Sequence, residues 1–341
     1  MVYYLPSEWH EQTCVQLTWP HKDTDWNYML PEIEKCFLAL ATEIAQRQKL
    51  IVVAPERPEI LKNFPYEENL FFVESSTNDT WARDHAFITM LGEDRKPLLL
   101  DFRFNGWGMK FAADKDNQIN RNLFREGVFD GEYVSCKDFV LEGGSIESDG
   151  NGTLMTTSEC LLSVNRNDWM KKDEIEAYLK KRFNLKQVLW IDHGYLSGDD
   201  TDSHVDTLAR MCPDDTIAYV KCEDIQDEHY EALRAMEEQL KTFRTLDGRP
   251  YRLLALPMAE AVYDEDGERL PATYANFLIM NEVVLYPTYS QPVNDSKAAE
   301  VLAEAFPTRE IIGVDCSAII RQHGSLHCVT MQYPCNNNLT K

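Results

Sequence analysis

Segments with helical periodicity alternate with extended apolar runs along the whole chain, and this alternation restricts the folds available to it. Apolar residues recur at helical spacing in five segments: 31–48, 116–128, 168–183, 226–244 and 295–306. Extended apolar runs follow them, including 50–54, 187–191, 252–256 and 311–314. Strand-like stretches precede several helices, as at 86–90 and 282–286. The pattern predicts an α/β chain, and it fits both a doubly wound sheet and a repeat of five similar units.

Length and composition indicate one large core. The chain has 341 residues, of which 44% are apolar, and it lacks a linker rich in Pro, Gly or Ser. We therefore expect a single domain over 1–341. The first residues do not resemble a signal peptide, and no apolar stretch reaches the roughly 18 residues that cross a bilayer. Nine cysteines without a Cys-x-x-Cys pair complete the prediction of a cytoplasmic protein with free thiols.

The strongly negative charge narrows the possible partners. The formal net charge is −23, from 57 acidic and 34 basic residues. Such a surface repels nucleic acids and anionic membranes, so we expect neither as a partner. It attracts small cations, although simple solubility accounts for the charge equally well.

Cys328 is a candidate nucleophile. It lies in Gly324–Thr330, in an apolar, β-branched setting that predicts a strand, and His323 and His327 stand nearby. A thiol, an imidazole and several acids scattered along a sequence are typical of a thiol-nucleophile enzyme. The alternative for any single cysteine is a buried structural residue.

His204 and Asp206 are a candidate base and acid. If they lie on a strand, both side chains point to the same face, because they are two residues apart. Further carboxylates crowd the preceding segment 199–203, which lacks the glycine and the final acid of an EF-hand loop. A surface loop is the alternative.

Three further segments combine polar groups with aromatic residues or glycines. Trp81–Asp84 and Asn105–Gly108 each place a tryptophan beside polar groups, and Glu142–Gly144 puts an acid before two glycines that permit close backbone approach. Taken singly, each is also typical of a core tryptophan or a turn. The sequence contains no dinucleotide, phosphate-loop or zinc-protease motif.

Taken together and in order, these segments resemble the agmatine deiminase family, which includes the Porphyromonas-type peptidylarginine deiminases. The similarity runs nearly end to end. The segments that carry it are Ser7–Trp9, Thr18–His21, Asn78–Asp84, Phe104–Gly108, Leu141–Gly150, Gly152–Thr157, Asn165–Asn167, Thr201–Asp206, Tyr274–Phe277 and His327–Thr330.

The resemblance implies the pentein fold, an α/β propeller of five ββαβ-like units around a pseudo-fivefold axis. It implies agmatine deiminase activity, in which agmatine is hydrolysed to N-carbamoylputrescine and ammonia on the route to putrescine. No cofactor and no metal are expected. The partner is a small cationic guanidine, and because the family often forms dimers or larger assemblies, we expect a homo-oligomer.

The resemblance also assigns roles to five residues. Cys328 attacks the guanidinium carbon, and Asp84 and Asp206 hold the guanidinium nitrogens. His204 protonates departing ammonia and then activates water. Glu142 orients His204. The remaining substrate contacts are expected from these four residues: Asp200 at the far ammonium, with Trp81, Trp107 and Asn276.

The chain departs from the family pattern at three places. The loop before the nucleophile, 322–326, lacks the usual Gly-Gly-Gly-Asn. Ser203 replaces the glycine that usually precedes the histidine, and Glu147 stands where a histidine is common. The altered loop leaves the substrate open between agmatine, peptidylarginine and another guanidine.

Two other functions remain alternatives. One is a metal hydrolase that uses His204, Asp206 and neighbouring acids. The other is a catalytically silent pentein that binds guanidines or proteins.

Overall fold

The computed structural model describes residues 3–93, 95–334 and 339 and shows an α/β chain built from several small sheets. The first of these has the order β19-β2-β3-β4, and the second has the order β1-β5-β6-β7. Their strands are β19 (Thr330–Pro334), β2 (Gln12–Thr18), β3 (Lys49–Ala54), β4 (Leu70–Glu74), β1 (Tyr3–Tyr4), β5 (Ile88–Gly92), β6 (Leu98–Arg103) and β7 (Glu132–Val140).

Three sheets have three strands each, in the orders β10-β9-β8, β11-β12-β13 and β16-β17-β18, and β14 pairs with β15 in a separate hairpin. Their strands are β8 (Ile146–Ser148), β9 (Thr153–Thr157), β10 (Gln187–Ile191), β11 (Ala209–Cys212), β12 (Thr216–Lys221), β13 (Arg252–Pro257), β14 (Val262–Tyr263), β15 (Arg269–Leu270), β16 (Leu278–Ile279), β17 (Val283–Thr288) and β18 (Glu310–Asp315).

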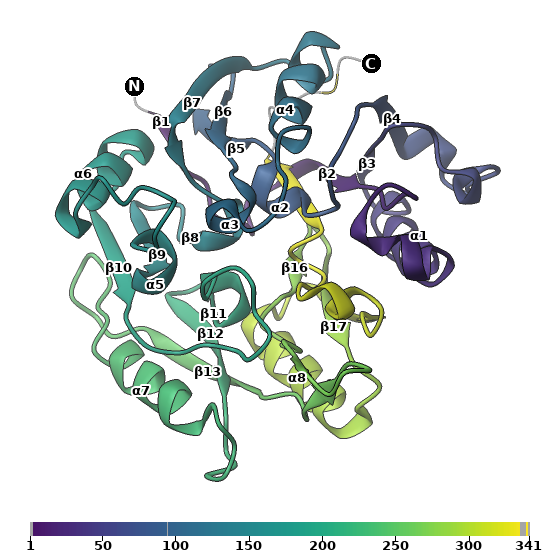
Figure 1. The fold of residues 1–341 in the computed structure, drawn as a ribbon. Helices are drawn as coiled ribbons and strands as arrows, with labels where there is room; N and C mark the ends of the chain where they lie inside the picture. Colours follow the sequence, from purple (N-terminus) through teal and green to yellow (C-terminus); the bar gives the residue numbers. More distant parts are fainter. Residues whose placement is uncertain (1–2, 94, 335–338, 340–341) are drawn as a thin grey trace.

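The same connection recurs in five sheets. A central strand pairs antiparallel with one neighbour and parallel with another, and a long helix joins the parallel pair. The long helices are α1 (Leu30–Ala45), α4 (Asp116–Arg125), α6 (Lys172–Phe183), α7 (Tyr230–Leu240) and α8 (Pro292–Ala305). They lie toward the rim of the molecule and the sheets lie inside them (Figure 1). The predicted helices and strands are therefore confirmed, as repeated small sheets and not one doubly wound sheet.

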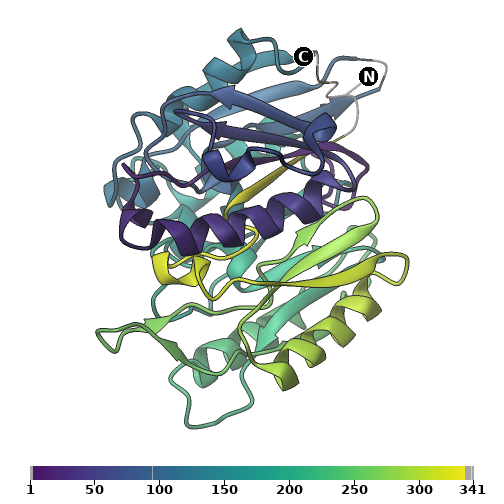
Figure 2. The same cartoon turned by 90° about the vertical axis from the view of Figure 1, so that its right-hand side faces the viewer.

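The first long helix illustrates how the sequence builds each layer. Its apolar residues Ile33, Phe37, Leu40 and Ile44 are all fully buried, as their spacing predicts. Pro31 stands in its first turn, where the missing backbone N–H costs nothing. Figure 2 shows α1 running along the first sheet.

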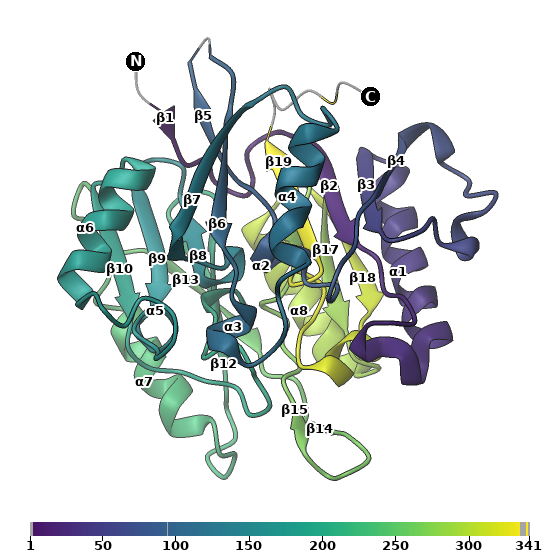
Figure 3. The ribbon, with the colours of Figure 1, turned by 45° about the horizontal axis from the view of Figure 1, so that its top comes forward.

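Chain ends far apart in sequence share one sheet. The last strand, β19, pairs antiparallel with β2 near the start of the chain, and Figure 3 shows the two side by side. This pairing carries the segment before β19, which holds the predicted nucleophile, into the middle of the fold. Among the described residues, no helix is both long and apolar enough to span a membrane.

Short helical turns carry many of the buried polar side chains. They are α2 (Ala82–His85), α3 (Gly106–Met109), α5 (Ser158–Leu161), η1 (Asp25–Met29), η2 (Glu59–Leu61), η3 (Glu67–Asn69), η4 (Gly143–Ser145), η5 (Val205–Thr207) and η6 (Ile319–Gln322). Of these, α2 lies against η4, and η4 lies against η5.

Candidate active site

A pocket brings together residues from five distant parts of the chain. It has about 430 Å³ of empty space, including its open mouth. Cys328 and Asp84 line it together with an aromatic wall and several carboxylates; the other lining residues are Asp25, Asp79, Trp81, Trp107, Phe111, Asp200, Thr201, Gln322, His323 and Gly324. The predicted nucleophile therefore faces a cavity.

Cys328 lies in a turn that ends at the start of β19, and the prediction of a strand at this position is wrong. Its backbone N–H and its Sγ both donate to Oδ1 of Asn276, at 3.2 and 3.4 Å. Its carbonyl accepts a 3.1 Å hydrogen bond from the backbone N–H of Arg83. These hydrogen bonds to distant residues of the same chain take the place of the backbone hydrogen bonds that a strand would make. They also place Asn276, a predicted substrate contact, directly beside the thiol.

The environment of the thiol disfavours its ionised form when the pocket holds no cation. Burial raises the pKa of Cys328 well above its ordinary value, and the charges on Asp206 and Asp84 raise it further. The eight cysteines in the described residues are all free, whereas Cys335 lies outside those residues.

Asp84 is held rigidly by two donors. Trp107 Nε1 donates to its Oδ2 at 2.9 Å, and the backbone N–H of Gly144 donates to its Oδ1 at 3.0 Å. Burial raises the pKa of Asp84 to about 7, and the charge on Glu142 adds to the shift. Trp107 adopts a positive φ of 55°, which turns its indole N–H toward the carboxylate.

His204 and Asp206 are both fully buried, but the prediction that they share a strand is wrong. His204 precedes the 3-10 turn η5, and Asp206 lies within it. The strand is interrupted because Asp202 and Ser203 adopt φ values of 63° and 62°, and Thr157 Oγ1 donates to the Ser203 carbonyl at 2.7 Å.

Both side chains nevertheless converge with Asp84. A Cβ added at Gly144 would lie 2.6 Å from His204 Nδ1, 2.9 Å from Asp84 Oδ1 and 3.0 Å from Asp206 Oδ2. The close backbone approach predicted for the two glycines is thus present, because no side chain fits there. His204 Nδ1 lies 3.6 Å from Asp84 Oδ1.

Three atoms in this cluster are buried without a hydrogen-bond partner. They are both ring nitrogens of His204 and Oδ1 of Asp206. Burial and the nearby charge of Arg166 lower the pKa of His204, and burial and the charge of Asp84 raise the pKa of Asp206. Buried polar atoms left open in this way suit a ligand that supplies the missing donors and charge.

Glu142 lies beside His204 but makes its hydrogen bonds elsewhere. Arg166 Nε donates to its two carboxylate oxygens at 3.0 and 3.2 Å, in a fully buried ion pair. Glu142, Cys160 and His204 each place one potential ligand atom within 4.8 Å of the others. A metal ion there would have to compete with the Arg166 guanidinium for Glu142, which does not suit a divalent cation.

The mouth of the pocket contains the loop that departs from the family pattern. Gln322 Nε2 donates to the Asp25 carbonyl at 3.2 Å on one side, and His323 Nδ1 lies 2.7 Å from the Gly198 carbonyl on the other. Between them, a Cβ at Gly324 would lie 2.1 Å from the Trp81 ring. The loop therefore bridges the mouth and packs on Trp81.

Asp200 lies at the same mouth, half-buried. Its carbonyl accepts a 2.7 Å hydrogen bond from Lys110 Nζ, which also contacts Asp202. The carboxylates of Asp25 and Asp79 line the pocket too, and burial is the main cause that raises the pKa of Asp79 to about 7. Sequence reasoning assigned no role to these two acids: Asp25 lies outside the family motifs, whereas Asp79 lies within the motif Asn78–Asp84, which was the one signal for it.

Sequence reasoning also missed a buried polar cluster behind Asp206. His327 Nδ1 lies 2.7 Å from Asp206 Oδ2, and His327 Nε2 lies 3.0 Å from Glu8. Arg210 contacts Glu8 at 2.6 Å and Glu147 at 2.6 Å. Glu147, one of the departures from the family pattern, is thus the partner of a buried arginine. Its unusual identity and the motif positions of Glu8 and His327 were the signals that marked the cluster.

Comparisons with known proteins find similar chains among deiminases. The chain matches, over residues 4–334, the model of a family described as Porphyromonas-type peptidyl-arginine deiminase. A Marinomonas protein described as a "putative agmatine deiminase" is 31% identical over 97% of this chain and 94% of its own length. The structure of the "putative arginine deiminase" of Porphyromonas gingivalis has a TM-score of 0.93 and 51% identity, with 98% of both chains covered. A Cys-to-Ser variant of the C. jejuni agmatine deiminase, with substrate bound, has a TM-score of 0.90 and 40% identity, and the match covers 100% of this chain and 98% of that one.

Proposed function

The chain belongs to the Porphyromonas-type peptidyl-arginine deiminase family, and from this premise we propose that it is an agmatine deiminase, which hydrolyses agmatine to N-carbamoylputrescine and ammonia. The observation that carries the proposal is that Cys328 and Asp84 line an acidic pocket, and that the unpartnered imidazole of His204 and a second buried carboxylate, Asp206, converge with Asp84. A guanidinium supplies the positive charge and the hydrogen-bond donors that these groups lack.

Guanidinium binding activates the nucleophile. The cation settles between Asp84 and Asp206 and neutralises the two charges that hold the pKa of Cys328 high. The thiol then loses its proton to His204, and Sγ attacks the guanidinium carbon. Because the free enzyme keeps the thiol protonated, its reactivity toward other electrophiles stays low until substrate arrives.

His204 moves protons in both halves of the reaction. An S–C bond forms, the C–N bond to one terminal nitrogen breaks, and ammonia leaves with the proton that His204 returns. His204 then takes a proton from water, whose oxygen attacks the same carbon; the S–C bond breaks and the thiol recovers its proton. The net reaction is guanidinium plus water to a urea and ammonium, and this sequence uses neither a metal nor an organic cofactor.

Glu142 contributes through its buried pair with Arg166. The pair places a carboxylate next to His204, where it orients the imidazole and opposes the charge of Arg166, which disfavours the imidazolium. Arg166 also binds Asp202 at 2.5 Å and the Thr201 carbonyl at 2.8 Å, so it braces the segment that leads into His204.

The mouth supports a substrate with a second cation. Carboxylates of Asp25, Asp79 and Asp200 line the pocket, and Trp81 and Phe111 form an apolar wall suited to a methylene chain. The ammonium of agmatine meets this acidic ring, and Asp200 is its proposed partner. The carboxylate of free arginine is repelled there.

Peptidylarginine is the second candidate substrate, because the matching family is described by that activity. The loop 322–324 bridges the mouth through contacts with the Asp25 and Gly198 carbonyls, and a polypeptide substrate would have to displace this bridge. This closure favours the small substrate.

The proposal extends to the whole chain. The connection that recurs in five sheets supports a pentein propeller of five units, formed by one catalytic domain over 1–341. We also infer a cytoplasmic homodimer that acts in putrescine synthesis. Sedimentation analysis tests the oligomeric state.

An ammonia-release screen tests the function directly. Agmatine, free arginine and an arginyl peptide are compared as kcat/KM at one ionic strength, since attraction of a dication depends on salt. We expect agmatine to lead by at least tenfold. Equal or better turnover of the peptide or of arginine overturns the agmatine assignment. Chelator-sensitive activity that survives a thiol reagent would instead identify a metal hydrolase.

A further inference from the structure

His327 links the substrate-binding carboxylate to a buried charged cluster that the proposed chemistry does not use. On one side, its Nδ1 lies 2.7 Å from Asp206 Oδ2. On the other, its Nε2 lies 3.1 Å from Arg210 Nη2 and 3.0 Å from each carboxylate oxygen of Glu8. The His327 side chain is fully buried.

We propose that His327 is a positioning residue, held between Asp206 and the Glu8–Arg210 pair, whose Nδ1–H binds one oxygen of Asp206 and leaves the other for the guanidinium. This inference rests on the proposed function, because it names what prepares the substrate-binding carboxylate.

The protonation of Nδ1 follows from the charge that Asp206 carries when the guanidinium is bound. An ionised Asp206 can only accept a hydrogen bond, so Nδ1 carries the proton that it donates to Oδ2. Nε2 faces both an acceptor and a donor, because it lies 3.0 Å from each oxygen of Glu8 and 3.1 Å from Arg210 Nη2. Burial and the charge of Arg210 lower the pKa of His327 well below its ordinary value, and Glu8 opposes them.

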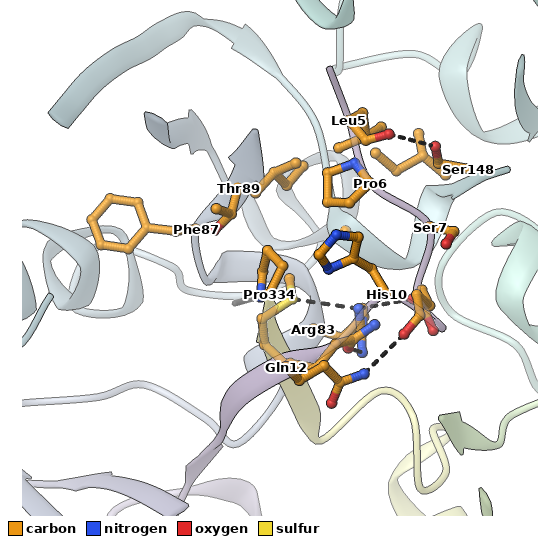
Figure 4. A pocket seen from close by; sticks show the side chains of 16 residues that line it. Leu5, Pro6, Ser7, His10, Gln12, Arg83, Phe87, Thr89, Ser148 and Pro334 are labelled. Carbon is orange, nitrogen blue, oxygen red and sulfur yellow. Dashed lines mark hydrogen bonds and ion pairs between the residues drawn. The ribbon is translucent and has the colours of Figure 1, made fainter. Parts of the chain in front are cut away.

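Glu8 also binds two arginines of the cluster. It contacts Arg210 Nη2 at 2.6 Å and Arg83 Nη1 at 3.1 Å, so both guanidinium groups are held in place. Glu8 and Arg83 also line a second pocket, away from Cys328, and Figure 4 shows Arg83 among its side chains. The cluster therefore lies between two cavities and separates the substrate site from the other one.

The result is an asymmetric Asp206. Its Oδ2 is fixed by His327, whereas its Oδ1 is buried without a partner. Without the Nδ1 donor, the carboxylate could rotate, and its ionised form would lose a stabilising hydrogen bond.

A pair of substitutions separates this role from simple packing. In His327→Asn, the amide nitrogen takes the place of Nδ1, so the hydrogen bond to Asp206 is kept. In His327→Gln, the amide nitrogen takes the place of Nε2, so the hydrogen bond to Asp206 is lost. We expect His327→Gln to lower kcat/KM for agmatine about 10- to 100-fold, the range for one lost hydrogen bond to a charged group. His327→Asn should recover most of that loss, and Glu8→Gln should fall between them.

The pH profile gives a readout that a packing defect does not move. The groups that face Asp206 are Asp84 and Glu147, which raise its pKa, and Arg210 and Arg83, which lower it. Loss of the Nδ1 donor raises that pKa further, so the acid limb of kcat/KM should shift to higher pH in His327→Gln and stay in place in His327→Asn. His10→Gln is the matched control, because His10 lines the second pocket without contacting Asp206 (Figure 4).

Binding of agmatine to the Cys328→Ser protein, measured by calorimetry, completes the test. In that background His327→Gln should bind agmatine at least tenfold more weakly than His327→Asn. Equal binding and equal acid limbs in the two variants would overturn the role of His327 while ammonia release by the native protein still supports the function. No ammonia release from any guanidine by the native protein would remove the proposed function instead.

Discussion

The deep end and the mouth of the pocket are built in opposite ways. At the deep end, Asp84, His204 and Asp206 are buried. Short backbone turns and hydrogen bonds between residues far apart in the sequence hold them in place. At the mouth, Asp25 is exposed, Asp200 is half-buried, and a loop bridges the gap through hydrogen bonds to two carbonyls. Under the proposed function, burial prepares the reacting groups at the deep end, while partly exposed charges at the mouth select the substrate.

The deep end also carries a cost that the mouth avoids. Two carboxylates with raised pKa values face each other, and three buried polar atoms lack partners. A site held in this state is less stable alone than with a cation bound. At the mouth, Asp25 and Asp200 are partly solvated, so they attract a cation at little cost.

Replacement of the nucleophile should have the largest effect. We expect Cys328→Ala to abolish ammonia release and Cys328→Ser to retain agmatine binding, because both leave the carboxylates in place. The measurements are a turnover assay and calorimetry. Cys222→Ser, at a buried cysteine that lines a different cavity, is the control. Near-normal turnover by Cys328→Ala would contradict the mechanism.

Loss of the imidazole comes next. His204→Ala should reduce kcat by roughly 10² to 10⁴, the range for a positioned acid–base group. Rapid-quench measurement of the covalent intermediate should show that both its formation and its breakdown slow down. His193→Ala, at an exposed histidine, should leave the rate unchanged. A purely structural His204 would lower the melting temperature without changing the rate of the folded protein.

The two carboxylates should separate activity from stability. Asp206→Asn should lower kcat/KM by roughly 10², since a buried charge pair with the substrate is lost. It should also raise Tm at pH 8, because the buried charge disappears while the amide oxygen still accepts from His327. The pKa of Asp206 in the folded protein lies above its unfolded value, so the charge costs stability progressively as pH rises between the two values. The gain in Tm should therefore vanish below about pH 4.

Asp84→Asn provides the contrast within the deep end. Its carboxylate accepts from both Trp107 and Gly144, and an amide oxygen can satisfy only one of these donors. We expect a smaller gain in Tm than for Asp206→Asn, measured by calorimetry at pH 8. An equal gain would show that the two donors are not both engaged.

Changes at the mouth should be smaller and selective. Asp200→Asn should reduce kcat/KM for agmatine about tenfold, as one partly solvated charge pair is lost, and should change turnover of guanidines without a distal cation far less. Raised salt should shrink the difference. An equal loss of kcat/KM for both kinds of substrate would show that Asp200 acts on the guanidinium end and not on the distal cation.

The smallest effect is expected at the bridging loop. Gln322→Ala removes one hydrogen bond to the Asp25 carbonyl, so kcat/KM should fall by no more than about tenfold, the value of one neutral hydrogen bond. The substitution should also weaken discrimination between substrates: turnover of the arginyl peptide relative to agmatine should rise. Unchanged discrimination would mean that the loop does not restrict the mouth.

Sequence patterns predicted the regular elements well and the active turns poorly. The five helices and the runs at 50–54, 187–191, 252–256 and 311–314 are present within a few residues, because periodic burial is a local property. Cys328, His204 and Asp206 lie in turns where strands were expected. There, hydrogen bonds to distant partners override the local preference for a strand.

By itself, the sequence determined the α/β class, the negative charge and, through ordered motifs, the residues that carry the proposed chemistry. Only the tertiary structure decided which of them meet. It paired Glu142 with Arg166, placed His327 between Asp206 and Glu8, and brought Asp25 to the pocket mouth. The physical reason is that these contacts join residues up to 319 positions apart. Their energies depend on burial and orientation, which no local pattern encodes.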